Sequence, residues 1–244
     1  MSDRPHIIAV IPARYASVRF PGKMLADLNG LPLVVRTFQN TKRCTMIDDV
    51  LVATDDERIV AAIQAAGGDA ILTDPALPSG TDRIHAAILG QPGDIVVNVQ
   101  GDEPLLPPEL VDDTVRMLLD HPEADASTAA TPATERDYTD PNVVKVACAE
   151  NGRALYFSRA PIPHQREGGV PDKLALRHIG LYVYRRETLN QFCMLTPSPL
   201  EACEKLEQLR LLEDGGTMVV HVTGDAGPGG VDTAEDLERV KSLM

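Results

Sequence analysis

The chain has 244 residues, with 23 Lys and Arg against 36 Asp and Glu, which gives a formal net charge of −13. So acidic a chain repels phosphate backbones and anionic lipids, which argues against nucleic acid or a membrane as its partner. No apolar run approaches the roughly 20 residues of a membrane span. The four cysteines have no C-x-x-C spacing, so we expect reduced thiols and a cytoplasmic protein.

In the first half, apolar strand-like runs alternate with helix-like segments, a pattern typical of a parallel sheet. We predict strands over residues 6–11, 48–53, 70–73 and 95–99, and helices over 31–44, 54–66, 81–89 and 107–119. Pro32 is expected in the first turn of its helix, and Thr54 is expected to cap the next one. These alternating elements predict a doubly wound α/β core.

Beyond Asp125 the alternation changes. Two strand-like runs, 143–149 and 154–157, flank Asn151-Gly152, which is a strong hairpin signal. After a proline-rich loop over 160–171 we predict a strand over 178–184, a helix over 199–213, a strand over 218–222 and a helix over 233–243. Because no break in composition separates these parts, we expect a single domain, 1–244, with an inserted region at about 126–200.

Three cations follow the first predicted strand. Pro12 and Ala13 lead into a loop that carries Arg14, Arg19 and Lys23. Ligands of α/β folds usually bind at the carboxyl ends of the strands, and Arg and Lys both suit phosphate oxygens. The loop is therefore a candidate polyanion site, the alternative being a solvated basic loop.

Two carboxylates follow later strands. Asp102 lies in Gln100-Gly101-Asp102, directly after the strand over 95–99, and Asp232 follows the glycine pair Gly229-Gly230. Mg²⁺ in nucleotide enzymes takes one or two carboxylates and completes its shell with water and phosphate oxygens. Asp102 and Asp232 fit that need, although either could be only a turn or cap residue.

A third candidate is the segment from Ser79 to Arg83, which opens a predicted helix. Ser79, Gly80 and Arg83 could meet an anion through backbone N–H groups, a hydroxyl and a guanidinium, or the segment could be an ordinary capped helix. The chain has neither G-x-G-x-x-G after its first strand nor G-x-x-x-x-G-K-[ST]. A dinucleotide oxidoreductase and a P-loop NTPase are therefore disfavoured.

Taken together, these segments resemble one enzyme family almost from end to end. The motifs are P-A-R-Y-A-S-V-R-F-P-G-K, S-G-T-D-R, Q-G-D-E-P, F-S-R-A-P-I-P, R-H-I-G-L-Y-V-Y-R, L-E-Q-L-R and G-V-D-T-A-E-D-L. They are similar to those of the 3-deoxy-manno-octulosonate cytidylyltransferases, or CMP-Kdo synthetases. Met24 and Ala234 stand where that pattern usually has Pro, and both are peripheral to the charged groups.

The resemblance implies a three-layer Rossmann-like nucleotidyltransferase fold with a mainly parallel sheet and an inserted antiparallel hairpin region. It also implies transfer of CMP from CTP to the sugar acid 3-deoxy-D-manno-octulosonate (Kdo), with release of pyrophosphate, for lipopolysaccharide synthesis. Mg²⁺ and a homodimer are further implications. The inserted region would then serve sugar binding and dimerisation.

Residue roles follow from the motifs and the resemblance together. The expected nucleotide-binding residues are Pro12, Ala13, Arg14, Lys23, Ser79, Gly80 and Arg83, and the expected catalytic residues are Arg14, Lys23, Asp102 and Asp232, the last two as metal ligands. By similarity the sugar-binding residues are Gln100, Arg159, His178, Tyr182, Glu207 and Gln208. His178 could instead be a structural histidine, and Glu207 and Gln208 could belong to a solvated helix face.

Two other functions compete with this one. The chain could be a cytidylyltransferase for a modified Kdo, for a sialic acid or for methylerythritol phosphate, but the F-S-R and R-H-I-G segments favour Kdo. It could also be a non-catalytic nucleotide-sugar sensor on the same fold. Retention of Lys23, Asp102 and Asp232 argues against a sensor.

Overall fold

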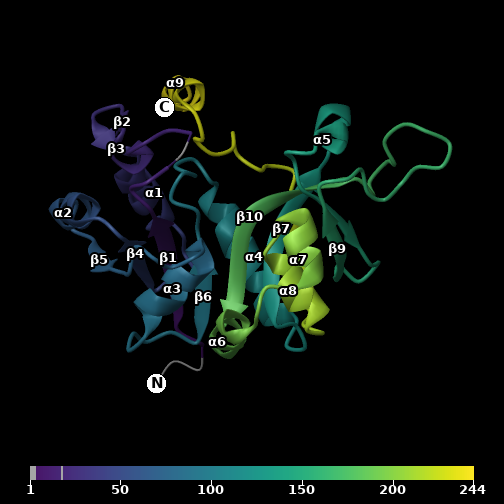
Figure 1. Ribbon diagram of the computed structural model, residues 1–244, viewed down its shortest axis with the longest axis horizontal. Coiled ribbons are helices and arrows are strands. Elements are labelled where there is room, and N and C mark those ends of the chain that lie inside the picture. Colours follow the sequence, from purple (N-terminus) through teal and green to yellow (C-terminus); the bar gives the residue numbers. More distant parts are fainter. Residues whose placement is uncertain (1–3, 18) are drawn as a thin grey trace. The chain divides into compact units, whose positions relative to one another are not determined.

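The computed structural model describes residues 4–17 and 19–244 (Figure 1). Its chain forms two compact units. The first unit runs to Asp112 and resumes at Gly227, and the second unit is Asp113–Ala226. Each unit has its own strands and helices and is described by itself.

The first unit is built on a parallel sheet. Its strands are ordered β6 (Ile95–Asn98), β1 (Ile7–Ala13), β4 (Asp49–Thr54) and β5 (Asp69–Leu72). All seven residues of β1 are buried, as expected for a central strand that is covered on both faces. The carboxyl ends of all four strands therefore lie at one edge, where the loop after Ala13 and the turn at Gly101 both begin.

Helices and a small hairpin complete the first unit. They are η1 (Lys23–Leu25), β2 (Asp27–Leu28), β3 (Leu31–Pro32), α1 (Leu33–Thr41), α2 (Glu57–Ala65), α3 (Gly80–Ile88), α9 (Ala234–Lys241) and α4 (Pro108–Asp120), which ends in the second unit. A separate hydrophobic cluster contains Leu28, Leu33, Val231, Leu237 and Val240. This cluster fixes the C-terminal segment against the residues that follow the cationic loop.

The second unit is mostly antiparallel. β10 (Leu176–Arg185) pairs antiparallel with β7 (Ala126–Pro132) and with β8 (Lys145–Cys148), and β11 (Met218–Val222) pairs parallel with β7. β8 and β9 (Ala154–Ser158) form an antiparallel hairpin. The helices are α5 (Glu135–Thr139), α6 (Arg186–Met194), α7 (Pro199–Glu204) and α8 (Gln208–Glu213).

The α/β class, with parallel strands and an antiparallel hairpin, is as predicted. Gly152 adopts a φ of 81° in the turn between β8 and β9, the left-handed conformation that Asn-Gly hairpins require. The predicted strands of the first unit are also present, within a few residues of their expected ends.

Several local predictions were wrong. Thr54 ends β4 and does not cap α2, because the carboxylate of Asp56 accepts from the backbone N–H of Arg58 at 2.9 Å. Pro32 lies in β3 before the first turn of α1. The helix predicted over 199–213 is two helices, since Lys205 adopts a φ of 56° and ends α7.

Three elements of the second unit were not predicted at all. β7 has the sequence Ala-Ser-Thr-Ala-Ala-Thr-Pro, whose small residues carry little strand propensity of their own. It is a strand because β10 and β11 pair with its two edges. The short helices α5 and α6 were also missed.

Candidate active site

Lys23 joins the two predicted metal carboxylates. Its Nζ lies 2.6 Å from Oδ2 of Asp102 and 3.1 Å from Oδ1 of Asp232, and it also donates to the carbonyl of Val231 at 3.0 Å. The Lys23 side chain is only 9% exposed, whereas those of Asp102 and Asp232 are 26% and 47% exposed. One buried cation thus lies among three oxygens that two separate segments supply.

The backbone brings these segments together. A Cβ on Gly101 would lie 2.8 Å from the carbonyl oxygen of Pro12, so only glycine lets the turn after β6 approach the end of β1 this closely. The backbone N–H of Val231 donates to the carbonyl of Asp102 at 2.9 Å. Val231 is itself in the hydrophobic cluster, so packing sets the position of Asp232.

The site keeps Lys23 charged. Burial alone would lower the pKa of Lys23, but the carboxylates of Asp102 and Asp232 outweigh that effect and leave its pKa above the ordinary value. The same two carboxylates fit a divalent cation, since both reach one point now held by an ammonium. Within residues 4–17 and 19–244 no three His, Cys, Asp or Glu side chains gather into a metal site. An ion here would complete its shell with water and phosphate oxygens.

The other two cations of the loop differ in exposure and partners. Arg19 Nη2 donates to Oδ2 of Asp232 at 2.9 Å, and the Arg19 side chain is 69% exposed. Arg14 donates through Nη2 to the carbonyl of Leu77, while its buried Nε has no hydrogen-bond partner among residues 4–17 and 19–244. The loop before α3 therefore holds the Arg14 guanidinium at the sheet edge where β1 ends.

The segment that opens α3 adjoins the same edge. A Cβ on Gly80 would lie 3.5 Å from the ring of Pro12, so the first residue of α3 lies beside the predicted phosphate loop. Ser79 is the N-cap residue: its hydroxyl accepts from the backbone N–H of Asp82 at 3.1 Å and lies 2.6 Å from the Asp82 carboxylate. Ser79 and Gly80 thus adjoin the end of β1, and the Ser79 hydroxyl serves as an ordinary helix cap.

Arg83 is placed differently from the expectation of direct anion contact. Its side chain is 0% exposed, with Nη2 3.4 Å from Oδ2 of Asp55 and Nη1 donating to the hydroxyl of Thr73. Burial lowers the pKa of Arg83, and Asp55 partly offsets this effect. In this arrangement Arg83 has the role of a structural ion pair, and direct contact with a nucleotide would require it to leave its partners.

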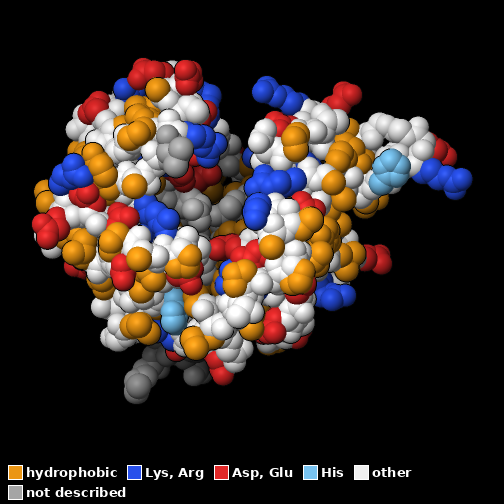
Figure 2. Space-filling model, in the orientation of Figure 1, with side chains coloured by type: hydrophobic (Ala, Val, Ile, Leu, Met, Phe, Trp, Pro, Cys, Tyr) orange, Lys and Arg blue, Asp and Glu red, His pale blue; other side chains and the backbone are white. Residues whose placement is uncertain are grey.

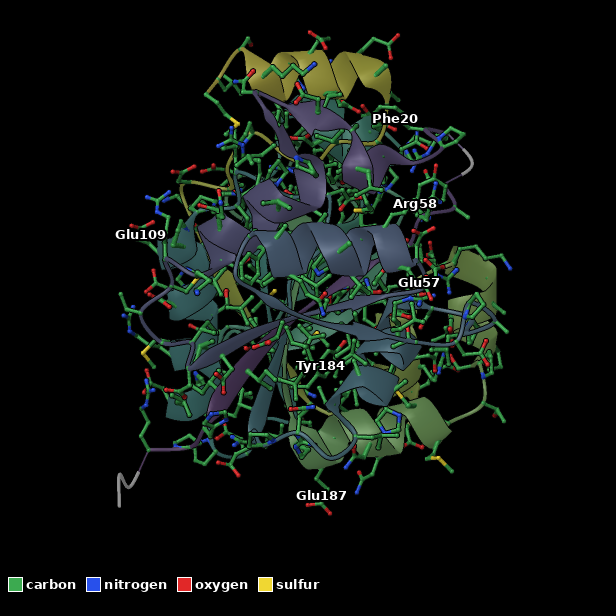
Figure 3. All side chains as sticks on the ribbon, turned by 90° about the vertical axis from the view of Figure 1, so that its left-hand side faces the viewer. Phe20, Glu57, Arg58, Glu109, Tyr184 and Glu187 are labelled. Atoms are coloured by element: carbon green, nitrogen blue, oxygen red, sulfur yellow. The ribbon has the colours of Figure 1, made fainter. Side chains whose placement is uncertain are left out.

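Asp55 was missed as a residue of the site. Its Oδ1 accepts from the backbone N–H of Tyr15 at 3.0 Å, so it links the cationic loop to Arg83. Arg58, in the first turn of α2, lies with its guanidinium carbon 3.7 Å from the centroid of the Tyr15 ring; Figure 3 labels Arg58 beside Glu57. Asp55 directly follows the predicted cap Thr54, and nothing in the sequence distinguishes it from an ordinary acidic residue of a first helical turn.

In the second unit, His178 and Tyr182 lie in a row of rings along β10. The ring of His178 lies 5.0 Å from Phe157 and 5.4 Å from Tyr182, between centroids. His178 Nε2 lies 2.9 Å from the hydroxyl oxygen of Thr128, which donates to the carbonyl of Leu181 at 2.7 Å. The Thr128 hydroxyl has one proton, so it must accept from Nε2–H. Burial lowers the pKa of His178 to about 3, so the ring is neutral.

Glu207 and Gln208 start α8 close to these rings. Burial raises the pKa of Tyr182, and the negative charge of the Glu207 carboxylate raises it further. Gln208 is only 3% exposed, so the alternative of a solvated helix face does not hold for it. Gln100 belongs to the first unit, where its side-chain amide donates to Asn98 at 2.9 Å.

Arg159 follows β9 and is held by α7. Its Nε donates to the backbone carbonyl of Glu204 at 2.9 Å, its backbone N–H donates to the Glu204 carboxylate at 3.0 Å, and Nη1 donates to the carbonyl of Pro141 at 3.3 Å. No carboxylate of the described residues lies within 4.0 Å of its guanidinium nitrogens. The charge of Arg159 is therefore available to an anionic ligand.

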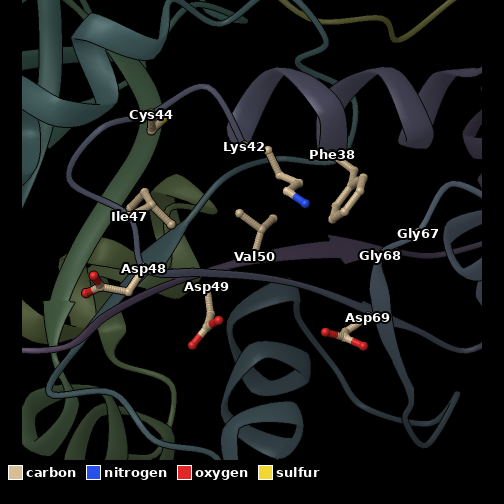
Figure 4. Close-up of a pocket in the computed structure, with 10 residues that line it drawn as sticks. All are labelled: Phe38, Lys42, Cys44, Ile47, Asp48, Asp49, Val50, Gly67, Gly68 and Asp69. Atoms are coloured by element: carbon tan, nitrogen blue, oxygen red, sulfur yellow. The ribbon is translucent and has the colours of Figure 1, made fainter.

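A pocket of the first unit lies away from these residues. It is lined by Phe38, Lys42, Cys44, Ile47, Asp48, Asp49, Val50, Gly67, Gly68 and Asp69 (Figure 4). Asp49 and Asp69 begin β4 and β5, so the pocket is at the amino ends of these strands. Three carboxylates make it unsuited to a phosphate ligand.

Comparisons with known proteins give the family. A model of the cytidylyltransferase family matches residues 8–220. The 3-deoxy-manno-octulosonate cytidylyltransferase of Anaeromyxobacter dehalogenans is 48% identical over 241 residues, covering 98% of this chain and 98% of its own. That of Chloroherpeton thalassium is 45% identical over 240 residues, with 97% of each chain covered. This chain belongs to the 3-deoxy-manno-octulosonate cytidylyltransferase family.

The solved structures agree. CMP:2-keto-3-deoxy-manno-octonic acid synthetase complexed with CTP superimposes with a TM-score of 0.93 at 38% identity, covering 98% of each chain. A putative glucose-1-phosphate thymidylyltransferase from Bacillus anthracis has a TM-score of 0.68 at 17% identity and shares the fold alone. The resemblance that the motifs indicated is therefore confirmed.

Two further observations concern the helices and the surface. None of the described helices combines the length and the apolar character that a membrane crossing requires. Figure 2 shows Lys and Arg side chains scattered among Asp and Glu on the face in view, with no broad basic surface there. A member of this family that binds a triphosphate must therefore attract it with a local set of cations.

Proposed function

We propose that this chain transfers CMP from CTP to Kdo and releases pyrophosphate. The observation that carries this proposal is the contact of Lys23 with both Asp102 and Asp232. In this contact one lysine and two aspartates meet at the carboxyl edge of a parallel sheet, where α/β enzymes bind nucleotides, and this supports a phosphate-binding role for the lysine and a metal-binding role for the aspartates. The names of the relatives supply the substrates.

On the nucleotide side, Lys23 and Arg14 bind the phosphates of CTP. Pro12, Ala13, Ser79 and Gly80 line the same edge through their backbone, and Arg83 supports the loop through Asp55 and Tyr15. Asp102 and Asp232 would hold Mg²⁺, since their oxygens converge on one cation. When bound, Mg²⁺ supplies charge neutralisation at the phosphates and acidifies a nearby hydroxyl.

The reaction is an in-line displacement. The anomeric hydroxyl of Kdo gives up its proton to solvent and attacks the α-phosphorus of CTP. As the new O–P bond forms, the bond from the α-phosphorus to the oxygen that bridges to the β-phosphorus breaks, and pyrophosphate leaves with that oxygen. Arg14 and Lys23 hold the triphosphate and balance the charge that gathers on the leaving group. Lys23 remains protonated in this role because its pKa is raised.

On the acceptor side, Arg159 binds the carboxylate of Kdo. Support for this comes from its guanidinium, which has no carboxylate partner among the described residues. His178 and Tyr182 supply a neutral ring and a hydroxyl, and Glu207 and Gln208 supply a carboxylate and an amide. Gln100, whose amide donates to Asn98, is also proposed to bind the acceptor. These neutral and acidic groups suit the hydroxyls of a sugar.

The wider setting is also part of the proposal. The inserted region at about 126–200, within a single nucleotidyltransferase domain, carries sugar recognition and joins two copies of the chain into a homodimer. Leu155 and Leu174, 53% and 61% exposed in the second unit, support an apolar contact there. CTP places the reaction in the cytoplasm, and its product supplies lipopolysaccharide synthesis.

A steady-state assay of pyrophosphate release tests the function. We expect turnover with CTP, Mg²⁺ and Kdo, and at least 100-fold lower kcat/KM when ATP replaces CTP or when a sialic acid or methylerythritol phosphate replaces Kdo. A higher kcat/KM with one of those acceptors than with Kdo would make the chain a cytidylyltransferase for that acceptor instead. Binding of nucleotide without any turnover would make it a sensor and would contradict the proposal.

A further inference from the structure

We propose that Lys145 is a positioning residue for Arg159, and through Arg159 for recognition of the acceptor carboxylate. The proposal rests on the sugar-binding function proposed above for Arg159. Lys145 begins β8, and Arg159 directly follows β9, the other strand of the same hairpin. Lys145 does not touch the substrate itself.

Lys145 is a fully buried cation. Its residue is 0% exposed, and its Nζ donates to three backbone carbonyls, those of Asp140 at 2.8 Å, Val143 at 2.6 Å and Arg159 at 2.7 Å. An ammonium has three N–H donors, so these contacts use all of them. Lys145 therefore joins the segment before β8 to the residue after β9.

Burying the Lys145 ammonium among backbone carbonyls lowers the stability of the folded chain relative to an apolar side chain at the same position. No carboxylate of the described residues lies within 4.0 Å of the Lys145 ammonium, and burial lowers its pKa. Burial of a charge without a paired charge is unfavourable, and an apolar side chain of similar length would avoid that penalty. We infer that the geometry that Lys145 imposes is the reason for its presence.

Lys145 contacts the backbone of Arg159 directly and contacts its guanidinium through segment 140–143. One of its hydrogen bonds fixes the Arg159 carbonyl, and the other two fix segment 140–143, whose Pro141 carbonyl accepts from Arg159 Nη1 at 3.3 Å. Glu204 holds the backbone N–H and Nε. Nη2 donates no hydrogen bond to any described residue. The direction of Nη2 is therefore set jointly by the Glu204 contacts and by the Pro141 contact, and the second of these depends on Lys145.

The first test is Lys145→Met, which keeps the length of the side chain and removes the charge and the donors. We expect the KM for Kdo to rise about tenfold, because small displacements of a positioned group cost up to 100-fold. The KM for CTP should stay within about twofold of wild type. Lys173→Met, which removes an exposed lysine of the second unit, is the matched control and should change neither constant.

A double-mutant cycle separates positioning from general support. In an Arg159→Ala background, Lys145→Met should change the Kdo KM by less than about twofold, because the group it positions has gone. An additional tenfold loss in that background would overturn the proposal. An unchanged Kdo KM in the single variant would overturn it as well.

The remaining outcomes are also decisive. If Arg159→Ala alone leaves the Kdo KM unchanged, the proposed sugar role of Arg159 fails, and the positioning role fails with it. If Lys145→Met does not fold, Lys145→Gln, which keeps an N–H donor, takes its place in the same cycle. Loss of the fold in both variants would give Lys145 a purely structural role and overturn the proposal.

Discussion

The ammonium of Lys23 lies 2.6 Å from a carboxylate oxygen of Asp102. In the proposed reaction these two side chains have different ligands, since Lys23 binds phosphate and Asp102 binds Mg²⁺. Their direct contact means that Lys23 neutralises Asp102 and Asp232 when neither ligand is present. Lys23 must exchange these partners for phosphate oxygens when CTP binds.

This contact predicts competition between Lys23 and a divalent cation. In Lys23→Met we expect Mn²⁺ to bind about tenfold more tightly in the absence of nucleotide, because a nearby positive charge is removed. The KM for CTP should rise at the same time. Electron paramagnetic resonance of free Mn²⁺ measures the affinity, with Lys173→Met as an exposed control. Weaker or unchanged Mn²⁺ binding would show that Lys23 does not screen the carboxylates.

Asp102→Asn and Asp232→Asn should each keep the fold and lower kcat at least 100-fold at saturating Mg²⁺. Each substitution removes an anionic oxygen from the predicted magnesium site and nearly preserves the shape of the side chain. Thermal unfolding followed by circular dichroism checks the fold. A variant with near-normal kcat would exclude that residue as a metal ligand.

Asp55→Asn should destabilise the protein by on the order of 3 kcal/mol, because it leaves the buried guanidinium of Arg83 without its carboxylate. Urea unfolding measures this loss. The control is Asp113→Asn, whose partner Arg116 is half-exposed, so the cost should stay below about 1 kcal/mol. Equal and small losses in both variants would indicate that Arg83 does not depend on Asp55.

His178 should make stability depend on pH. Its pKa is about 3 in the folded protein and about 6.5 in an unfolded chain. Between these values the unfolded state binds one more proton, so this contribution is complete above about pH 6.5 and falls as the pH drops toward 3. Between pH 7 and 5, wild type should lose more stability than His178→Gln in urea unfolding. Parallel losses would mean that His178 titrates normally.

The parts of the site that could be predicted from sequence lie where a strand ends. Lys23, Asp102 and Asp232 follow strands or glycine turns, and the rule that parallel strands share a carboxyl edge was enough to group Lys23 with Asp102. The prediction that Asp232 belongs to the same site depended on a second signal, the glycine pair that precedes it. For these three residues the local sequence pattern and the rule for parallel sheets both predicted the carboxyl edge of the sheet.

The residues that were missed act through contacts between distant segments. Asp55 has the sequence context of a helix cap, and its real partners are Tyr15 and Arg83. Lys145 interrupts the apolar run Val143-Val144-Lys145-Val146, which is a visible anomaly, but its three carbonyl partners appear only once the hairpin is folded. Strand β7 was also missed, because it forms by pairing with β10 and β11, which are distant in sequence.

The measurement that tests the central claim most directly is ³¹P nuclear magnetic resonance of a reaction containing the protein, CTP, Mg²⁺ and Kdo. Transfer of CMP to Kdo predicts a phosphodiester signal and pyrophosphate in equal amounts, with both formed at least 100-fold more slowly when Asp102→Asn replaces wild type. Formation of CMP and pyrophosphate without the diester, of CDP and phosphate, or of no new signal at all would contradict the account.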